Sequence, residues 1–215
     1  MNSKEITKHS SAAAQATAHC SSRTAHPQSI TGLVLAGGMG RRMDSRDKGL
    51  VAFRGKPMVA HVIERLGPQV ETLVINANRS LDQYDTFGYP VVSDEISGYA
   101  GPLAGLHAGL LACKTSLIVT APCDSPFLPT DLVARLHAAL EENIAELSVA
   151  KTGNQAHPVF TLCSTTLLPS LTAFLESGGR KIDTWYSAHR VVEVQFEDES
   201  AFANINTIDE LQHLQ

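Results

Sequence analysis

The stretch from Gly32 to Pro57 combines glycines and cations at a spacing that suits the binding of a polyanion. Gly37, Gly38 and Gly40 follow an apolar run, and glycines let a ligand approach backbone N–H groups without meeting a Cβ atom. The cations that stand between positions 41 and 48 are Arg41, Arg42, Arg46 and Lys48. Backbone amides followed by cations are typical of a site for phosphate groups, above all those of a nucleoside triphosphate. The alternative is a glycine-rich turn with a solvated basic flank.

The spacing of these residues excludes the two commonest phosphate loops. A Walker A loop needs a Gly-Lys pair followed by Ser or Thr, but the Gly55-Lys56 pair is followed by Pro57, and Leu50 stands where the first glycine is required. The dinucleotide fingerprint, read from Gly38, needs a small residue where the chain has Met43. The pattern therefore indicates a phosphate loop of a third kind.

Polar side chains follow several predicted strands at the point where each strand ends. Asn76, Asp94 and Asp124 come after apolar runs, as does the Gly37-Gly38 loop. Ligands of parallel sheets bind beyond the carboxyl ends of the strands. We therefore expect these groups to gather at one edge of the sheet, although they are far apart in sequence.

Asp124 is the strongest single candidate for metal binding. It follows a buried strand, and Pro122 and Pro126 on either side restrain its turn. A carboxylate in that place can hold a magnesium ion against a nucleotide phosphate. The alternative is an aspartate that stabilises a turn or begins a helix.

The apolar periodicity predicts strands over 33–36, 73–75, 90–92, 117–120, 147–150, 157–162 and 191–196. Helices are predicted over 57–66, after Ser80, and over 103–113, 129–140, 167–175 and 180–188, with a last helix whose N-cap Thr207 forms a capping box with Glu210. The alternation predicts an α/β fold: a single three-layer α/β/α domain with a mostly parallel, doubly wound sheet and a Rossmann-like, nucleotide-binding first half.

Composition limits the class of protein. With 215 residues, 43% of them hydrophobic, the chain suits one domain, predicted over 30–215, after a disordered tail over 1–29 that is poor in large apolar residues. The net charge of −5 predicts no nucleic-acid partner, and no apolar run approaches the length of a membrane span. Its 4 cysteines form no C-x-x-C pair, which argues against a zinc site or disulfide framework and favours the cytoplasm.

Together the motifs resemble the nucleotidyltransferases of glycosyltransferase-A type fold, and among these the molybdenum cofactor guanylyltransferases. The resemblance covers residues 31–215 and rests on Leu35-Ala36-Gly37-Gly38, Asp47-Lys48-Gly49, Asn76-Ala77-Asn78-Arg79, Gly101-Pro102-Leu103-Ala104-Gly105, Pro122-Cys123-Asp124-Ser125-Pro126, His157-Pro158 and Asn204-Ile205-Asn206-Thr207. It implies transfer of GMP from GTP to the phosphate of molybdenum-molybdopterin, which releases pyrophosphate and forms a guanine dinucleotide cofactor.

The resemblance also implies roles for individual residues. Asp124 would bind Mg²⁺ and nucleotide and, with Lys48 and Arg42, would be catalytic. The other nucleotide contacts would be Leu35, Ala36, Gly37, Gly38, Asn76 and Asp94. The expected acceptor-binding residues are His157, Arg180, Asn204 and Asn206. Purely structural roles remain open for these four: a restrained residue before a proline for His157, a solvated helix start for Arg180, and a helix-entry loop for the two asparagines.

The implied partners are GTP, molybdenum-molybdopterin, cofactor-delivery proteins and the molybdoenzymes that they supply. Rival functions are a cytidylyltransferase acting on the same pterin, a sugar-phosphate nucleotidyltransferase, for which the chain is short, and a non-catalytic carrier of molybdopterin or nucleotide. Choice of base rests on the resemblance alone.

Overall fold

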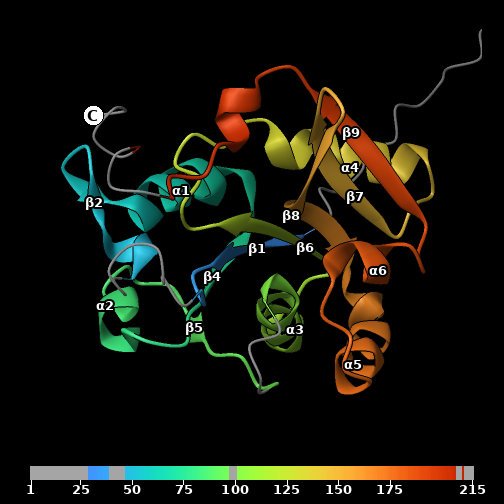
Figure 1. Cartoon of the computed structure of the whole chain (residues 1–215), viewed down its shortest axis with the longest axis horizontal. Helices are drawn as coiled ribbons and strands as arrows, with labels where there is room; N and C mark the ends of the chain where they lie inside the picture. Colours follow the sequence, from blue (N-terminus) through green and yellow to red (C-terminus); the bar gives the residue numbers. More distant parts are fainter. Residues whose placement is uncertain (1–28, 39–46, 97–100, 207–209, 211–215) are drawn as a thin grey trace, which may run out of the picture.

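The computed structural model describes residues 29–38, 47–96, 101–206 and 210 (Figure 1). The predicted tail up to residue 28 and the catalytic candidate Arg42 lie outside the described residues. The same holds for the predicted N-cap Thr207. Glu210 is described, and its carboxylate accepts a hydrogen bond from the backbone N–H of Asn206 at 2.7 Å.

The described residues form a 7-stranded sheet in the order β5-β4-β1-β6-β8-β7-β9. Its strands are β1 (Ile30–Leu35), β4 (Thr72–Asn76), β5 (Val91–Val92), β6 (Leu117–Pro122), β7 (Leu147–Thr152), β8 (Gln155–Ser164) and β9 (Val191–Phe196). Among these strands β8 alone runs antiparallel to its neighbours. The predicted α/β class and mostly parallel sheet are confirmed.

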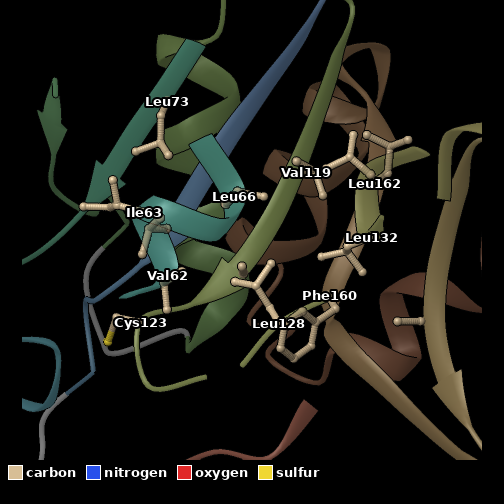
Figure 2. Close-up of a cluster of buried hydrophobic side chains, with 14 of the residues drawn as sticks. Val62, Ile63, Leu66, Leu73, Val119, Cys123, Leu128, Leu132, Phe160 and Leu162 are labelled. Atoms are coloured by element: carbon tan, nitrogen blue, oxygen red, sulfur yellow. The ribbon is translucent and has the colours of Figure 1, made fainter. Parts of the chain in front are cut away.

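Helices cover both faces of the sheet (Figure 1). α1 (Met58–Leu66) and α4 (Leu132–Glu142) lie on one face, and α3 (Pro102–Ala112), α5 (Leu168–Glu176) and α6 (Ile182–Tyr186) on the other. β1 shows why its sequence is apolar throughout: Val34 packs into one buried cluster and Leu33 into the other. Figure 2 shows the first cluster, in which Val62 and Leu66 of α1 gather with Leu132 of α4.

Small residues let α3 lie very close to the sheet. A Cβ atom on Gly109 would come within 2.4 Å of the Leu33 side chain, and one on Gly105 would come within 2.5 Å of Oδ1 of Asn76. α3 therefore packs directly on the strand ends that carry the polar candidates.

The sequence pattern missed several short elements. These are the two-stranded sheet of β2 (Ala52–Phe53) and β3 (Lys56–Pro57) and the 3-10 helices η1 (Lys48–Leu50), η2 (Gly67–Gln69), η3 (Thr165–Leu167) and η4 (Glu199–Phe202). Elements of two to four residues are too short for a periodicity to show. α2 (Leu81–Asp85) follows Ser80 as predicted. The helix predicted over 180–188 is shorter and forms only at α6. No helix in the described ranges is long and apolar enough to cross a membrane.

Candidate active site

The structure brings most of the predicted nucleotide-binding residues together at the carboxyl edge of β1, β4 and β5. The backbone N–H of Ala36 donates to the carbonyl of Asn76 at 2.8 Å, so the loop after β1 lies beside the loop after β4. The amide of Asn76 donates to Oδ1 of Asp94 at 2.9 Å. A Cβ on Gly37 would lie 3.0 Å from Oδ1 of Asn76, whereas one on Gly38 would meet nothing within 4 Å.

Asn78 completes this group, although it was not among the predicted site residues. Its side-chain amide donates to Oδ2 of Asp94 at 2.8 Å and to the carbonyl of Gly37 at 3.3 Å. In return the backbone N–H of Asp94 donates to Oδ1 of Asn78 at 2.8 Å. We call Gly37, Asn76, Asn78 and Asp94 the Asn–Asp group. Residues i and i+2 of an extended segment point the same way. Because Asn78 stands two positions after Asn76, this spacing could have identified Asn78 as a site residue from the sequence.

A second group forms around Lys48. Its Nζ atom lies 3.1 Å from Oδ2 of Asp124 and donates to Oδ1 of Asn206 at 2.6 Å. The backbone N–H of Ile205 donates to the carbonyl of Asp124 at 2.9 Å, and the hydroxyl of Ser125 is hydrogen-bonded to the side chain of Asn204. The loop after β9 and η4 thus closes over the end of β6. We call Lys48, Asp124 and Asn206 the Lys–Asp group.

Burial makes the Lys–Asp group a focused electrostatic site. The side chains of Lys48 and Asp124 are 21% and 12% exposed, so water screens the pair less than it screens a surface salt bridge. The buried thiol of Cys123 beside it has its pKa raised by burial and further by the charge of Asp124. The raised pKa keeps this thiol neutral, so Lys48 and Asp124 are the charged groups of this part of the site.

A separation of β6 from β8 opens space beside Pro122 at the end of β6. β8 pairs with β6 only from Val119↔Leu162 to Leu117↔Ser164. Beyond that point the hydroxyl of Thr120 donates to the carbonyl of Val159 at 2.6 Å, and the hydroxyl of buried Tyr186 donates to the carbonyl of Pro158 at 2.7 Å. The register of β8 against β7 also shifts here, between Val149 and Ala150, and Pro122 at the end of β6 has no N–H to continue the ladder, so the strands diverge.

The divergence leaves a pocket of about 360 Å³. Its lining includes the acceptor candidates His157 and Asn204, together with Pro122, Gln155, Glu199 and Phe202. The imidazole of His157 stacks on the Phe202 ring, with centroids 4.7 Å apart and planes 13° from parallel. Burial lowers the pKa of His157, an effect that nearby Glu199 partly opposes. The lowered pKa favours a neutral His157 ring, so the wall offers a flat, uncharged aromatic surface with the Glu199 carboxylate in the same lining, which suits a planar heterocycle.

Arg180 has contacts of another kind. Its guanidinium donates to the carbonyl of Leu175 at 2.9 Å and to that of Gly179 at 2.7 Å. These contacts satisfy the end of α5, and Arg180 is not among the residues that line the pocket beside His157. Its predicted role in acceptor binding stays a prediction.

Comparison with known proteins identifies the family. A model of the MobA-like NTP transferase domain matches residues 32–192, most of the chain. The chain belongs to this family. A molybdenum cofactor guanylyltransferase of Cupriavidus metallidurans is 55% identical over 187 residues, covering 85% of this chain and 92% of that protein. One from Ralstonia pickettii is 51% identical over 194 residues, covering 86% and 95% respectively.

Solved structures agree with this membership. The crystal structure of molybdopterin-guanine dinucleotide biosynthesis protein A from Archaeoglobus fulgidus matches with a TM-score of 0.71 at 25% identity, covering 86% of this chain and 96% of that one. A Mycobacterium tuberculosis protein crystallised as a manganese complex shares the fold, with a TM-score of 0.63 at 17% identity over 87% of this chain and 98% of that one. The resemblance inferred from the sequence motifs is confirmed.

The donor atoms of this MobA-like NTP transferase suit a hard divalent cation that is shared with a substrate. The described residues contain no group of three or more His, Cys, Asp or Glu side chains able to hold a metal by themselves. Asp124 has one carboxylate oxygen paired with Lys48, and within the described structure no hydrogen bond reaches its Oδ1. Magnesium commonly binds through one or two carboxylates together with substrate phosphates and water. The residues therefore fit a metal that arrives with a nucleotide.

Proposed function

We propose that the chain transfers GMP from GTP to the phosphate of molybdenum-molybdopterin. An oxygen of the acceptor phosphate forms a bond to the α-phosphorus of GTP, and the bond from that phosphorus to the oxygen bridging the β-phosphate breaks. The products are the guanine dinucleotide cofactor and pyrophosphate. The chain is a nucleotidyltransferase by family, and its guanylyltransferase relatives support the choice of GTP and pterin.

The position of the Lys–Asp group carries this proposal. It lies at the carboxyl edge of the sheet, where the loops after β1, β4, β5 and β6 meet, and Asn204 beside it also lines the aromatic-walled pocket. A nucleotide whose nucleoside contacts the Asn–Asp group would direct its phosphates toward Lys48, and an acceptor in the pocket would approach them from the β8 side. This is the arrangement that a group transfer between two bound anions requires.

The side chains then act by position and charge. The backbone amides of Gly37 and Gly38 and the ammonium of Lys48 would bind the triphosphate, joined by Arg42. Carboxylate and amide groups of Asp94, Asn76 and Asn78 would hold the guanosine through its donors and acceptors. Leu35 and Ala36 would contribute backbone to the same site. No general base is required, because a phosphate monoester is already ionised near neutral pH.

Asp124 would hold Mg²⁺ through its carboxylate. When bound, the ion would supply Lewis-acid stabilisation of charge on the phosphates. With Mg²⁺ on the Asp124 carboxylate, the ammonium of Lys48, which lies 3.1 Å from Oδ2 of Asp124, would be available to contact phosphate. His157, Asn204, Asn206 and Arg180 are proposed to bind the acceptor, in which the pterin would lie against the His157–Phe202 wall.

The test is pyrophosphate release by purified protein with magnesium and molybdopterin, offered GTP, CTP, ATP and UTP separately. We expect release with GTP alone and a loss of roughly a hundredfold or more in Asp124→Asn, which removes the negative charge but keeps the shape. Asp82→Asn, an exposed carboxylate on α2, is the matched control and should keep full activity. Release with CTP would show that the chain transfers CMP rather than GMP. No release from folded protein that binds pterin would favour a carrier.

The remaining expectations belong to this proposal as well. We propose that residues 1–29 form a disordered tail and 30–215 the catalytic domain. Cofactor-delivery proteins and the molybdoenzymes that they supply are the proposed partners. The cytoplasm is the proposed location, which agrees with the free thiols of Cys113, Cys123 and Cys163.

A further inference from the structure

Asp47 occupies a buried position directly before Lys48. Its side chain is 8% exposed, and its contacts differ from those of Lys48. Its Oδ1 atom accepts a hydrogen bond from the hydroxyl of Tyr84 at 2.5 Å, and Oδ2 lies 3.5 Å from Nε of Arg79. The carboxylate is therefore held by one hydrogen bond, from Tyr84, and by the nearby charge of Arg79, since Oδ2 accepts no hydrogen bond within the described structure.

Tyr84 makes the more rigid of these contacts. It lies on α2 with 0% of its surface exposed, packed in the core cluster that also contains the buried side chains of α1. Burial raises the pKa of its hydroxyl, with a further contribution from neighbouring Cys123, so the hydroxyl keeps its proton and donates to Asp47. The ring cannot move without displacing core residues.

The 3-10 turn that bears Lys48 is fixed from two further sides. The backbone N–H of Leu50 donates to the carbonyl of Asp47 at 3.0 Å, which closes the turn. Gly49 fits against Tyr84 and Cys123, because a Cβ atom there would lie 2.5 Å from the Tyr84 hydroxyl and 3.3 Å from Sγ of Cys123. Asp47 and Tyr84 thus determine where the Lys48 side chain leaves the backbone.

Arg79 extends the same contacts toward the nucleoside side of the site. It directly follows Asn78, whose amide holds Asp94. Its ion pair with Asp47 therefore joins the loop of the Asn–Asp group to the turn of the Lys–Asp group. The Asn–Asp group and the Lys–Asp group come from separate segments of the chain, and this ion pair links the two.

We propose that Asp47 and Tyr84, with Arg79, are positioning residues that fix the Lys48 ammonium relative to Asp124 and to the Asn–Asp group. The proposal rests on the proposed function for the catalytic role of Lys48, but the position of the amine can be measured without turnover. None of the three residues is assigned contact with the reacting atoms.

A double-mutant cycle provides the kinetic test. Tyr84→Phe keeps the ring and removes the hydroxyl, and we expect it to lower kcat/KM for GTP roughly tenfold in the wild-type background. In the Lys48→Ala background the same change should have less than about a twofold effect, since coupled residues do not add. Equal losses in both backgrounds, accompanied by a lower Tm, would show a merely structural role and overturn the proposal.

Two further variants keep the test decisive. Asp47→Asn retains an oxygen that can accept from Tyr84, so it should keep more activity than Asp47→Ala. Tyr89→Phe, a half-buried tyrosine just beyond α2, is the matched control and should match the wild type. If Asp47→Asn were no more active than Asp47→Ala, the hydrogen bond to Tyr84 would not be the contact that matters.

The second readout is the acylation rate of the Lys48 amine in nucleotide-free protein, followed by mass spectrometry. Tyr84→Phe should raise this rate several-fold, because the amine leaves its contacts with Asp124 and Asn206 more often, while Tyr89→Phe should leave it unchanged. An unchanged rate in folded Tyr84→Phe would contradict the positioning role. Wild-type protein without turnover would contradict the proposed function, and the acylation rate would still decide the positioning role.

Discussion

Replacing Gly37 with alanine tests the packing of the Asn–Asp group. A Cβ atom at Gly37 would lie 2.8 Å from Nδ2 of Asn78 and 3.0 Å from Oδ1 of Asn76. Neither amide is free to move aside, because both donate to the carboxylate of Asp94. Gly38 is the matched control, because a Cβ atom there meets nothing within 4 Å and neither glycine has a left-handed φ.

The expected magnitude follows from opposing effects. Overpacking against fixed neighbours costs about 1–3 kcal/mol, whereas the lower freedom of alanine in the unfolded chain returns about 0.4–1 kcal/mol. Taken at the middle of both ranges, Gly37→Ala should lose about 1–2 kcal/mol of unfolding free energy, and Gly38→Ala should gain up to about 1 kcal/mol. For a chain of this size Gly37→Ala then melts roughly 2–8 °C below the wild type.

Differential scanning calorimetry of the three proteins measures the difference in Tm, and pyrophosphate release measures KM for GTP. We expect KM to rise in Gly37→Ala, because the displaced amides would no longer present the same groups to the nucleoside. Equal melting temperatures for the two variants would refute the packing argument. A lower Tm in Gly37→Ala with unchanged KM would support the packing argument but would show that the Asn–Asp group does not contact the nucleotide.

The other predictions concern α4 and the pocket wall. Ile144 follows α4 with a φ of 49° and 78% exposure, so Ile144→Gly should raise the unfolding free energy by about 1 kcal/mol in urea titrations, and a loss would contradict the strain. Because burial lowers the pKa of His157 below its ordinary 6.5, the unfolded chain binds the proton more readily, and stability should fall as the pH drops below about 6.5. His157→Gln should reduce the dependence of the unfolding free energy on pH, measured between about pH 7.5 and pH 5. An unchanged dependence would show that other titrating groups cause it.

The strands and the site edge were largely predictable from local patterns. The apolar run of β1 indicated a strand buried on both faces, and Leu33 and Val34 do pack into opposite clusters. Asn76, Asp94 and Asp124 follow predicted strands, so the parallel topology alone placed them on one edge. Such inferences succeed because periodicity and strand ends are properties of neighbouring residues.

The pocket could not be predicted in the same way. β8 was predicted as an ordinary strand over 157–162, but it starts at Gln155 and leaves β6 where hydroxyls of Thr120 and Tyr186 take its carbonyls. Tyr186 reaches Pro158 from 28 positions away, so no window of the sequence contains both partners. The position of the pocket depends on where a ladder stops, which is a property of packing.

By itself the sequence determined the family, the fold class, the order of most strands and helices and the residue types available for phosphate chemistry, because these follow from local spacing and motif order. Only the tertiary structure decided which of those residues meet. Lys48 contacts Asp124 from 76 positions away and Asn206 from 158 positions away. Asp47, next to Lys48, turns instead to Tyr84 and Arg79. A charged side chain has several possible partners along the chain, and the cost of burying it unpaired selects the partner that the folded backbone brings within reach.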